Sequence, residues 1–225
     1  MSKPAASALL VVLCLLCGFA RFGYVGQGQT FAAEIGTTTA AGHSKEPIGR
    51  VYVSHGKTRI ETRALADGFF VVDADQRAVW FVRPRQRIFM DARRSSPLTQ
   101  VFVRVDPNDA CRQWQVMEHI AGTAPGSDPW RCERLGRGVV GGQETLKYEV
   151  VLDEHHRSYR WIDPLRQFPI RVKNADGTVM TLETMVDGAQ PATLFAVPAG
   201  YRKFDPLQLI EQIKQSDVWV EPPRK

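Results

Sequence analysis

The sequence predicts a mainly β protein of the α+β class, built on antiparallel strands with a few short helices. Between residues 49 and 91, turn signals rich in Gly, Asp and Pro recur about every ten residues, the spacing typical of an all-β sheet. Residues 57–63 alternate cleanly, so that Thr58, Ile60 and Thr62 share one face. No amphipathic segment of helix length interrupts this run, which argues against parallel βαβ units.

The first half of the sheet is expected to be an antiparallel meander. His55-Gly56 and Asp67-Gly68 are turn dipeptides, and the runs that flank them are rich in β-branched and aromatic residues. Strands are therefore expected at residues 49–54, 57–63, 69–72, 79–82 and 87–91.

A helix is expected over residues 110–121, capped by Asp109 and ended by Gly122. One face of this helix carries Trp114, Met117 and Ile120. It is the candidate for a lid across the open sheet; the alternative is a fixed plug of the core, and the two differ only in whether the helix moves.

Two further segments have the sequence features of short helices. Residues 96–105 fit both a strand and a short helix, and both interpretations stay open. Asp205 can cap an amphipathic helix that begins at Pro206, with Leu209 and Ile213 one turn apart.

The second half of the sheet is expected to end in a closing segment. Strands are indicated at residues 146–152, 160–163, 168–173 and 179–186. After them, Leu194, Phe195 and Val197 lead to the turn Pro198-Ala199-Gly200-Tyr201. Pro fixes φ there and Gly supplies turn freedom, so the flanking apolar groups can close a sheet edge.

Several motifs in this half follow one another in a fixed order: Trp161-x-Asp163, Phe168-Pro169-Ile170-Arg171, an Asp176-Gly177 hairpin, and Leu194-Phe195-x-Val197-Pro198-x-Gly200-Tyr201. This order resembles bacterial periplasmic proteins of the LolA/LolB-like lipoprotein-carrier superfamily. The first strands also resemble that superfamily, in Lys57-x-Arg59-x-Glu61 and in the later Asp73 and Trp80. The resemblance covers residues 49–204.

The resemblance implies a strongly curved antiparallel sheet, a half-open barrel covered by short helices, whose concave face holds acyl chains or other apolar ligands. It implies binding rather than catalysis. It also implies that Arg59 holds the lid by donating to carbonyl groups of a covering helix. Alternation offers a simpler explanation, a charged outer face shared with Lys57, Glu61 and Arg63. The carriers open with an N-terminal helix, which residues 21–47 are too rich in Gly and Thr to form.

One exported domain is expected. Residues 1–20 have the basic start, apolar run and small residues of a signal peptide, with a cut after Ala32 as the alternative. A retained anchor is disfavoured because the apolar run is shorter than the roughly 20 residues of a bilayer span. Residues 21–47 are expected to be a flexible lead, 48–204 the half-barrel domain, and 205–225 a C-terminal helix and tail. Export implies a periplasmic location.

The cysteines that remain after such cleavage are Cys111 and Cys132. An oxidising compartment favours a disulfide between them. Two free thiols or half of a metal site is the alternative, but neither cysteine has another Cys or a His nearby at ligand spacing.

The sequence contains no compact catalytic or cofactor motif, such as G-x-S-x-G, H-E-x-x-H or a Walker loop. We therefore expect no enzyme activity, cofactor or metal. The run Asp153-Glu154-His155-His156 could bind a metal, but four polar residues between strands more often form a solvated turn. The net charge of +5 would suit nucleic acid or a membrane surface. Because the positive residues are scattered, we expect no nucleic acid and leave only peripheral membrane contact open.

Apolar side chains exceed what one face of a thin sheet requires. An ordinary core under two helices would explain them, whereas the resemblance favours a half-barrel cavity for a lipid, an acylated protein or another apolar ligand. The alternatives are an envelope module that recognises a partner protein and, third, an enzyme acting on lipid or glycan. The candidate cavity residues, beside Ile170, are Phe69, Val71, Trp80, Val82, Ile88, Met90, Tyr148, Trp161, Met180 and Leu182.

Overall fold

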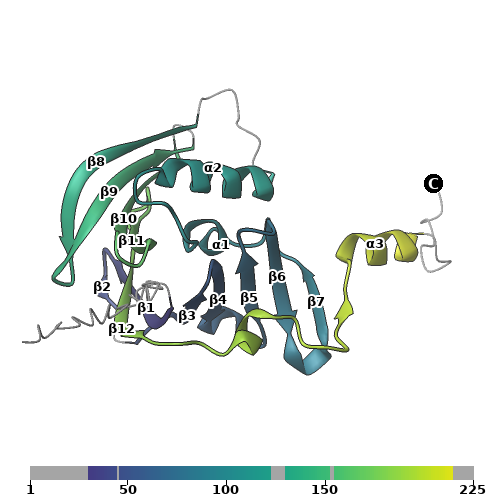
Figure 1. Ribbon diagram of the computed structural model, residues 1–225. Helices are drawn as coiled ribbons and strands as arrows, with labels where there is room; N and C mark the ends of the chain where they lie inside the picture. The colour runs from purple at the N-terminus through teal and green to yellow at the C-terminus, as the bar shows by residue number, and fades with distance from the viewer. Residues whose placement is uncertain (1–29, 45, 123–129, 153–154, 215–225) are drawn as a thin grey trace, which may run out of the picture.

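The computed structural model describes residues 30–44, 46–122, 130–152 and 155–214. Its strands form one 13-stranded sheet, which curls but stays open between its edge strands β13 and β8. Helices α1 and α2 lie together across the concave side (Figure 1). The predicted class, a mainly β half-barrel covered by short helices, is confirmed.

The first half of the sheet follows the predicted meander closely. His55 and Gly56 have φ values of 45° and 79°, the left-handed conformation that a two-residue hairpin turn requires. Short 3₁₀ helices, η1 (Arg63–Leu65) and η2 (Pro84–Gln86), make two of the other connections. The strands are β3 (Gly49–Ser54), β4 (Lys57–Thr62), β5 (Phe69–Asp73), β6 (Ala78–Arg83) and β7 (Ile88–Asp91).

The second half of the sheet contains a long strand that the sequence analysis did not predict, β8 (Arg131–Val140). Charged residues and glycines hide its alternation, and a bulge between Arg134 and Gly136 shifts its register. The remaining strands of this half are β9 (Gln143–Val151), β10 (Arg157–Asp163), β11 (Phe168–Lys173) and β12 (Val179–Asp187).

The helices lie where the sequence places them. Helix α2 (Ala110–Ala121) ends at Gly122, whose φ of 66° lets its N–H donate to the His119 carbonyl. Asp109 precedes α2 but makes no side-chain capping bond, unlike the prediction. The ambiguous residues 96–105 contain a short helix, α1 (Leu98–Val101), followed by buried extended chain.

The closing segment runs along the side of the sheet away from α2 (Figure 1). It contains η3 (Ala192–Phe195) and β13 (Arg202–Lys203), which pairs with β7 and so extends that edge of the sheet, as the prediction of an edge-closing segment required. Helix α3 (Pro206–Lys214) follows, with the Asp205 carboxylate accepting from the Leu207 N–H at 3.0 Å.

Strand β1 (Phe31–Thr39) corrects the expectation that residues 21–47 are a flexible lead. It lies inside the sheet, antiparallel to β3 and to β12, and its end pairs with β2 (Gly42–His43). Small and Thr residues hide an alternation in which Phe31 and Ile35 are fully buried. Two neighbouring strands order this segment in spite of its composition. The alternative signal cut after Ala32 conflicts with this pairing.

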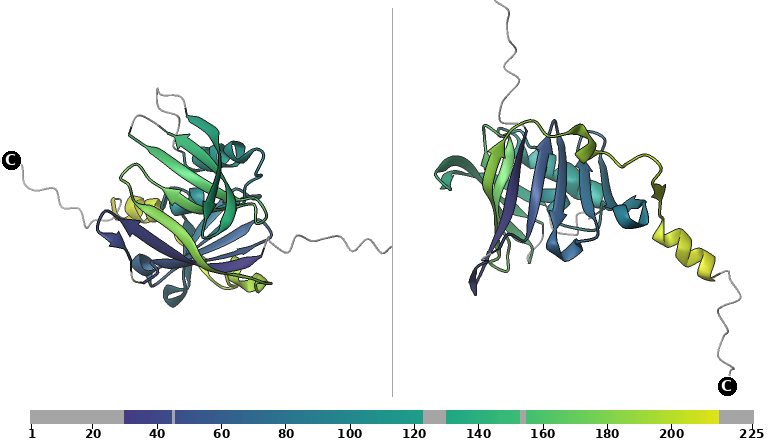
Figure 2. Two further views of the ribbon diagram at one scale, coloured as in Figure 1. Left: turned by 90° about the vertical axis from the view of Figure 1, so that its left-hand side faces the viewer. Right: turned by 90° about the horizontal axis from the view of Figure 1, so that it is seen from below.

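Two apolar clusters lie on opposite sides of the sheet. The helix-side core packs under α1 and α2 and includes Ile35, Ile60, Phe70, Trp114 and Phe168. The outer cluster lies under the closing segment and consists of Phe69, Val71 and Val82 with the half-buried Trp80, Phe89, Val197 and Tyr201. Figure 2 shows the sheet and its helices from the side and from below.

The signal peptide expected at residues 1–20 lies outside the described residues, as does the tail beyond residue 214. Within the described ranges, no helix has the length and apolar character that crossing a bilayer demands.

Replacing Ile35 with Ala tests how much β1 contributes to the stability of the fold. Ile35 is fully buried between Gly49 of β3 and Leu182 of β12, so we expect a loss of about 2–5 kcal/mol in the free energy of unfolding. Urea denaturation measures this loss. Thr39→Ala, at the exposed end of the same strand, is the control and should change stability by about 0.5 kcal/mol or less. Equal effects of the two substitutions would show that β1 is not ordered.

Candidate functional site

The side chains predicted to line one cavity are divided between the two apolar clusters. Successive residues of a strand point to opposite faces, so Phe69 and Phe70 of β5 cannot face the same space. Phe69, Val71, Trp80 and Val82 belong to the outer cluster. Tyr148 and Leu182 are buried in the helix-side core, and Trp161 and Met180 pack against it. Ile88 and Met90 are half-buried on β7, where Met90 pairs with Phe81.

Helix α2 covers the concave face as the lid interpretation requires. Trp114 and Met117 are at most 1% exposed, while Ile120 packs against the same core and is half-buried. Trp114 joins α2 to α1, because its Nε1 donates to the Val101 carbonyl at 3.4 Å. This distance is long for an N–H···O bond, so the hydrogen bond itself is weak, while apolar packing in the helix-side core also holds the two helices together.

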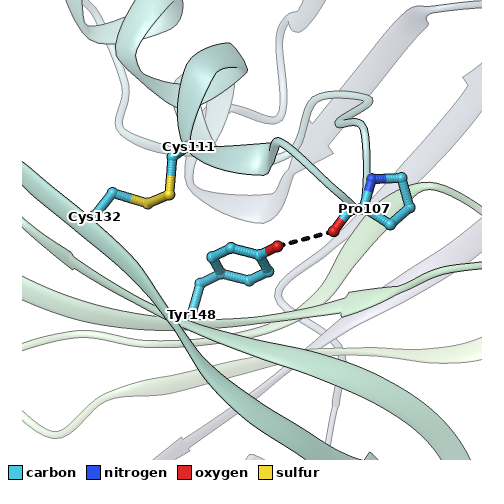
Figure 3. The surroundings of a disulfide bond; sticks show 4 residues. All are labelled: Pro107, Cys111, Cys132 and Tyr148. Atoms are coloured by element: carbon cyan, nitrogen blue, oxygen red, sulfur yellow. Dashed lines mark hydrogen bonds between the residues drawn. A yellow bond between two sulfur atoms is a disulfide. The ribbon is translucent and has the colours of Figure 1, made fainter.

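The N-terminal end of α2 is tethered to the sheet. The predicted disulfide joins Cys111 of α2 to Cys132 of β8. Beside it, the Tyr148 hydroxyl donates to the Pro107 carbonyl at 2.8 Å, and burial raises the pKa of Tyr148 (Figure 3). Any movement of α2 against the sheet must therefore pivot about this end.

Arg59 does not contact α2. It points to the outer face, where its guanidinium lies 3.3 Å from the centre of the Phe69 ring. Its Nη1 donates to the Leu194 carbonyl of η3 at 3.3 Å and its Nη2 lies 2.7 Å from Glu61. The predicted contact with the carbonyl of a covering helix thus exists, but the helix belongs to the closing segment and not to the lid. Alternation places the side chain on this face, since Thr58 and Ile60 point inward.

An apolar cavity of about 470 Å³ opens beside α1. Its walls include Ile48, Leu65, Phe70 and Leu98, and the Phe70 side chain also belongs to the helix-side core. The cavity therefore borders that core, on the helix side of the sheet.

At the rim of the cavity, Arg63 and Glu46 form an ion pair. The hydrogen bond that Arg63 donates to the Glu46 carboxylate lowers the pKa of Glu46. The serine hydroxyls at the cavity are bonded to backbone. Ser44 Oγ donates to the Glu46 carbonyl at 2.6 Å, and Ser96 Oγ accepts from the Leu98 N–H at 3.3 Å. Neither of these bonds joins a serine to a side-chain base.

A larger groove of about 580 Å³ lies on the outer face, next to Arg59 and Phe69. Two of its arginines are paired with carboxylates: Arg59 with Glu61, and Arg50 with Glu34 at 3.2 Å. The wall of this mixed-charge groove is more polar than that of the cavity beside α1, although both include apolar side chains.

The metal interpretation of residues 153–156 falls partly outside the described chain, since residues 153 and 154 are not described. Among the residues with described positions, no three His, Cys, Asp or Glu side chains come together in a group that could hold a metal ion.

The sequence analysis did not select Arg160 as a site residue. Its side chain, 3% exposed, lies beneath α2 on β10. The only sequence signal is its position two residues before the fully buried Ile162, on the same face of the strand.

Replacing Arg59 with Leu tests its placement on the outer face. Loss of the bond to Leu194 and of the contact with Phe69 should lower the free energy of unfolding by about 1–3 kcal/mol and reduce amide protection in residues 192–204. Urea denaturation and hydrogen exchange measure the two effects. The exposed Arg85, which borders the same groove, provides the control Arg85→Leu, for which we expect no change. Reduced protection in α2 instead would restore the lid role of Arg59.

No family model matches the chain, and no curated protein matches it. Solved structures do match. A structure of PNGF-II has a TM-score of 0.49 and 9% identity over 83% of this chain and 33% of PNGF-II, so the chain spans about a third of that protein. The Pseudomonas aeruginosa MucA/MucB complex matches with a TM-score of 0.39 and 12% identity, over 76% of this chain and 57% of the matched chain.

A Vibrio parahaemolyticus outer membrane lipoprotein-sorting domain matches with a TM-score of 0.34 and 13% identity, over 76% of this chain and 90% of that domain. All these TM-scores lie below 0.5, so none of these matches carries an argument about the function of this protein. The curled sheet with helices on its concave side is the half-barrel architecture that the sequence predicts.

Proposed function

We propose that the protein is a non-enzymatic binding protein of the bacterial periplasm, which holds an acyl chain or another apolar ligand between the sheet and the α1–α2 layer. The observation that carries this proposal is the apolar cavity of about 470 Å³ beside α1. Its volume falls within the roughly 300–1,000 Å³ of typical ligand sites. Its wall residue Phe70 also belongs to the helix-side core, so a chain that enters the cavity would extend under α2 only if α2 moves.

The contacts of α1 and α2 support such an extension. The Trp114–Val101 hydrogen bond between the two helices is long, whereas the disulfide at Cys111 cross-links the N-terminal end of α2 to the sheet. A ligand that binds the open arrangement better than the closed one shifts the population towards it, by as much as its affinities for the two arrangements differ. The apolar faces of Trp114 and Met117 are the surfaces that such a ligand would meet.

Two further observations support the proposed periplasmic location and the proposed binding function. The Cys111–Cys132 disulfide is typical of oxidising compartments, in agreement with the signal-like residues 1–20. The hydroxyls of Ser44 and Ser96 at the cavity are bonded to backbone groups, an arrangement that favours binding over nucleophilic catalysis.

A second candidate function, recognition of an envelope protein partner, is favoured by α3. This helix projects from the body of the molecule (Figure 1), and Leu207, Leu209 and Ile210 are 73%, 43% and 46% exposed. An apolar helix face that no described residue covers is a common docking element for the groove of another protein. The two functions are compatible, because α3 and the cavity are formed by different segments.

Filling the cavity tests the first function. Leu98→Trp places an indole in the cavity, so we expect binding of the apolar probe N-phenylnaphthylamine to weaken at least about tenfold, equivalent to about 1.4 kcal/mol. A fluorescence titration measures the affinity. Leu165→Trp is the matched control, because Leu165 is 82% exposed on a turn outside the cavity. Equal probe binding by both variants and the wild type would exclude the cavity as the binding site.

Photo-cross-linking tests the second function. A benzoylphenylalanine at Leu207 should give a discrete protein adduct in intact cells, because this side chain is exposed on the apolar face of α3. Gln208, the next residue of the same helix, is the control position and should give little adduct. Adducts with lipid alone, or equal adducts from both positions, would argue against a protein partner at α3.

A further inference from the structure

A buried positive charge lies beneath the lid helix. The Arg160 guanidinium is 4.6 Å from the centre of the Trp114 ring, and its Nη2 is 4.0 Å from Glu118 of the same helix. Its Nε and Nη1, although buried, donate to no acceptor among the residues that the structure describes. Arg160 therefore has one distant charged partner and unused hydrogen-bonding capacity.

The charge on Arg160 persists at neutral pH. Burial lowers the pKa of Arg160 to about 10, an effect that the nearby Glu118 opposes, so the guanidinium is still protonated at pH 7. A protonated guanidinium in an apolar core is costly unless its donors are satisfied. Stability does not explain this residue, because apolar side chains in place of a buried ion pair are often neutral or stabilising.

Trp114 connects Arg160 to the proposed ligand path. One side of the indole covers the guanidinium, and the indole Nε1 is bonded to α1, which carries the cavity residue Leu98. Movement of α2 about its tethered end would carry Trp114 and Glu118 away together. The same movement would uncover Arg160 and extend the cavity towards it.

On the basis of the proposed function, we propose that the bound chain ends in one anionic group, a carboxylate or a phosphate, and that the guanidinium of Arg160 binds this group when α2 moves away. Nε and Nη2 form one edge of the guanidinium, and Nη2 loses its contact with Glu118 when that residue leaves with α2, while Nη1 and Nη2 form the other edge. The planar guanidinium presents parallel N–H donors that match both kinds of anion. The acyl chain then runs from Arg160 beneath the displaced α2 towards the cavity beside α1. A neutral amphiphile would leave the donors of Arg160 unsatisfied, so the site discriminates by charge as well as by apolar character.

Three ligands with the same sixteen-carbon chain test this inference in the full-length protein: palmitate, hexadecyl phosphate and hexadecanol. Affinities are measured by displacement of N-phenylnaphthylamine, below the concentration at which each ligand aggregates. The wild type should bind palmitate, hexadecyl phosphate or both at least about tenfold more tightly than hexadecanol. The better of the two anions identifies the head group. This comparison needs no variant.

Arg160→Met should remove that preference and leave hexadecanol binding in place, because the apolar path is unchanged. Arg63→Met, which changes an arginine at the rim of the cavity, is the control and should keep the preference. Should Arg160→Met fail to fold, Arg160→Lys keeps the charge but not the planar donors, and it should reduce the preference.

The outcomes separate the two proposals. Equal affinity of the wild type for all three ligands would overturn the role of Arg160 while leaving the apolar binding function intact. Loss of the preference in Arg63→Met but not in Arg160→Met would move the head group to the rim and also overturn it. Failure of the wild type to bind any of the three would contradict the proposed function itself.

Discussion

The pairing of β1 with two strands from opposite halves of the chain is the constraint on which the structure depends. In the described sheet, β1 stands between β3 and β12, so it joins the meander β3–β7 to the later strands β8–β12. Without it, each half would expose a sheet edge and half of one core. Its buried Phe31 and Ile35 also place apolar groups where the curled sheet meets α1 and α2.

The curled sheet creates two surfaces with different roles. The concave side is filled by α1, α2 and the extended chain between them, whereas the outer side is covered by the closing segment, which Arg59 fastens through Leu194. Because the outer fastening does not involve α2, stability of the closing segment and movement of the lid can vary independently. The disulfide at Cys111 completes this division by fixing one end of the lid.

The proposed opening of the packed core would explain several features together. The cavity beside α1 is one place on the concave side that side chains do not fill, and the long Trp114–Val101 bond joins α1 to α2. Arg160 keeps unsatisfied donors under the same helix, a local cost that natural proteins concentrate at functional sites. A ligand that accepts hydrogen bonds from these donors and fills the space beneath α2 would remove this destabilisation. The free energy recovered would contribute to binding.

The sequence by itself determined the β class, the meander, α2 and the cysteine pair, because these follow from local periodicity, turn residues and compartment chemistry. Only the tertiary structure decided that residues 31–39 form a strand, since their order comes from two distant partners and not from their composition. The tertiary structure also decided on which face of the sheet each apolar residue lies. Phe69 and Trp80 look like cavity residues in sequence, but the closing segment, more than a hundred residues away in the chain, covers them. Arg160 escaped prediction for the same reason: a charge reveals itself as buried only when a helix from elsewhere in the chain lies over it.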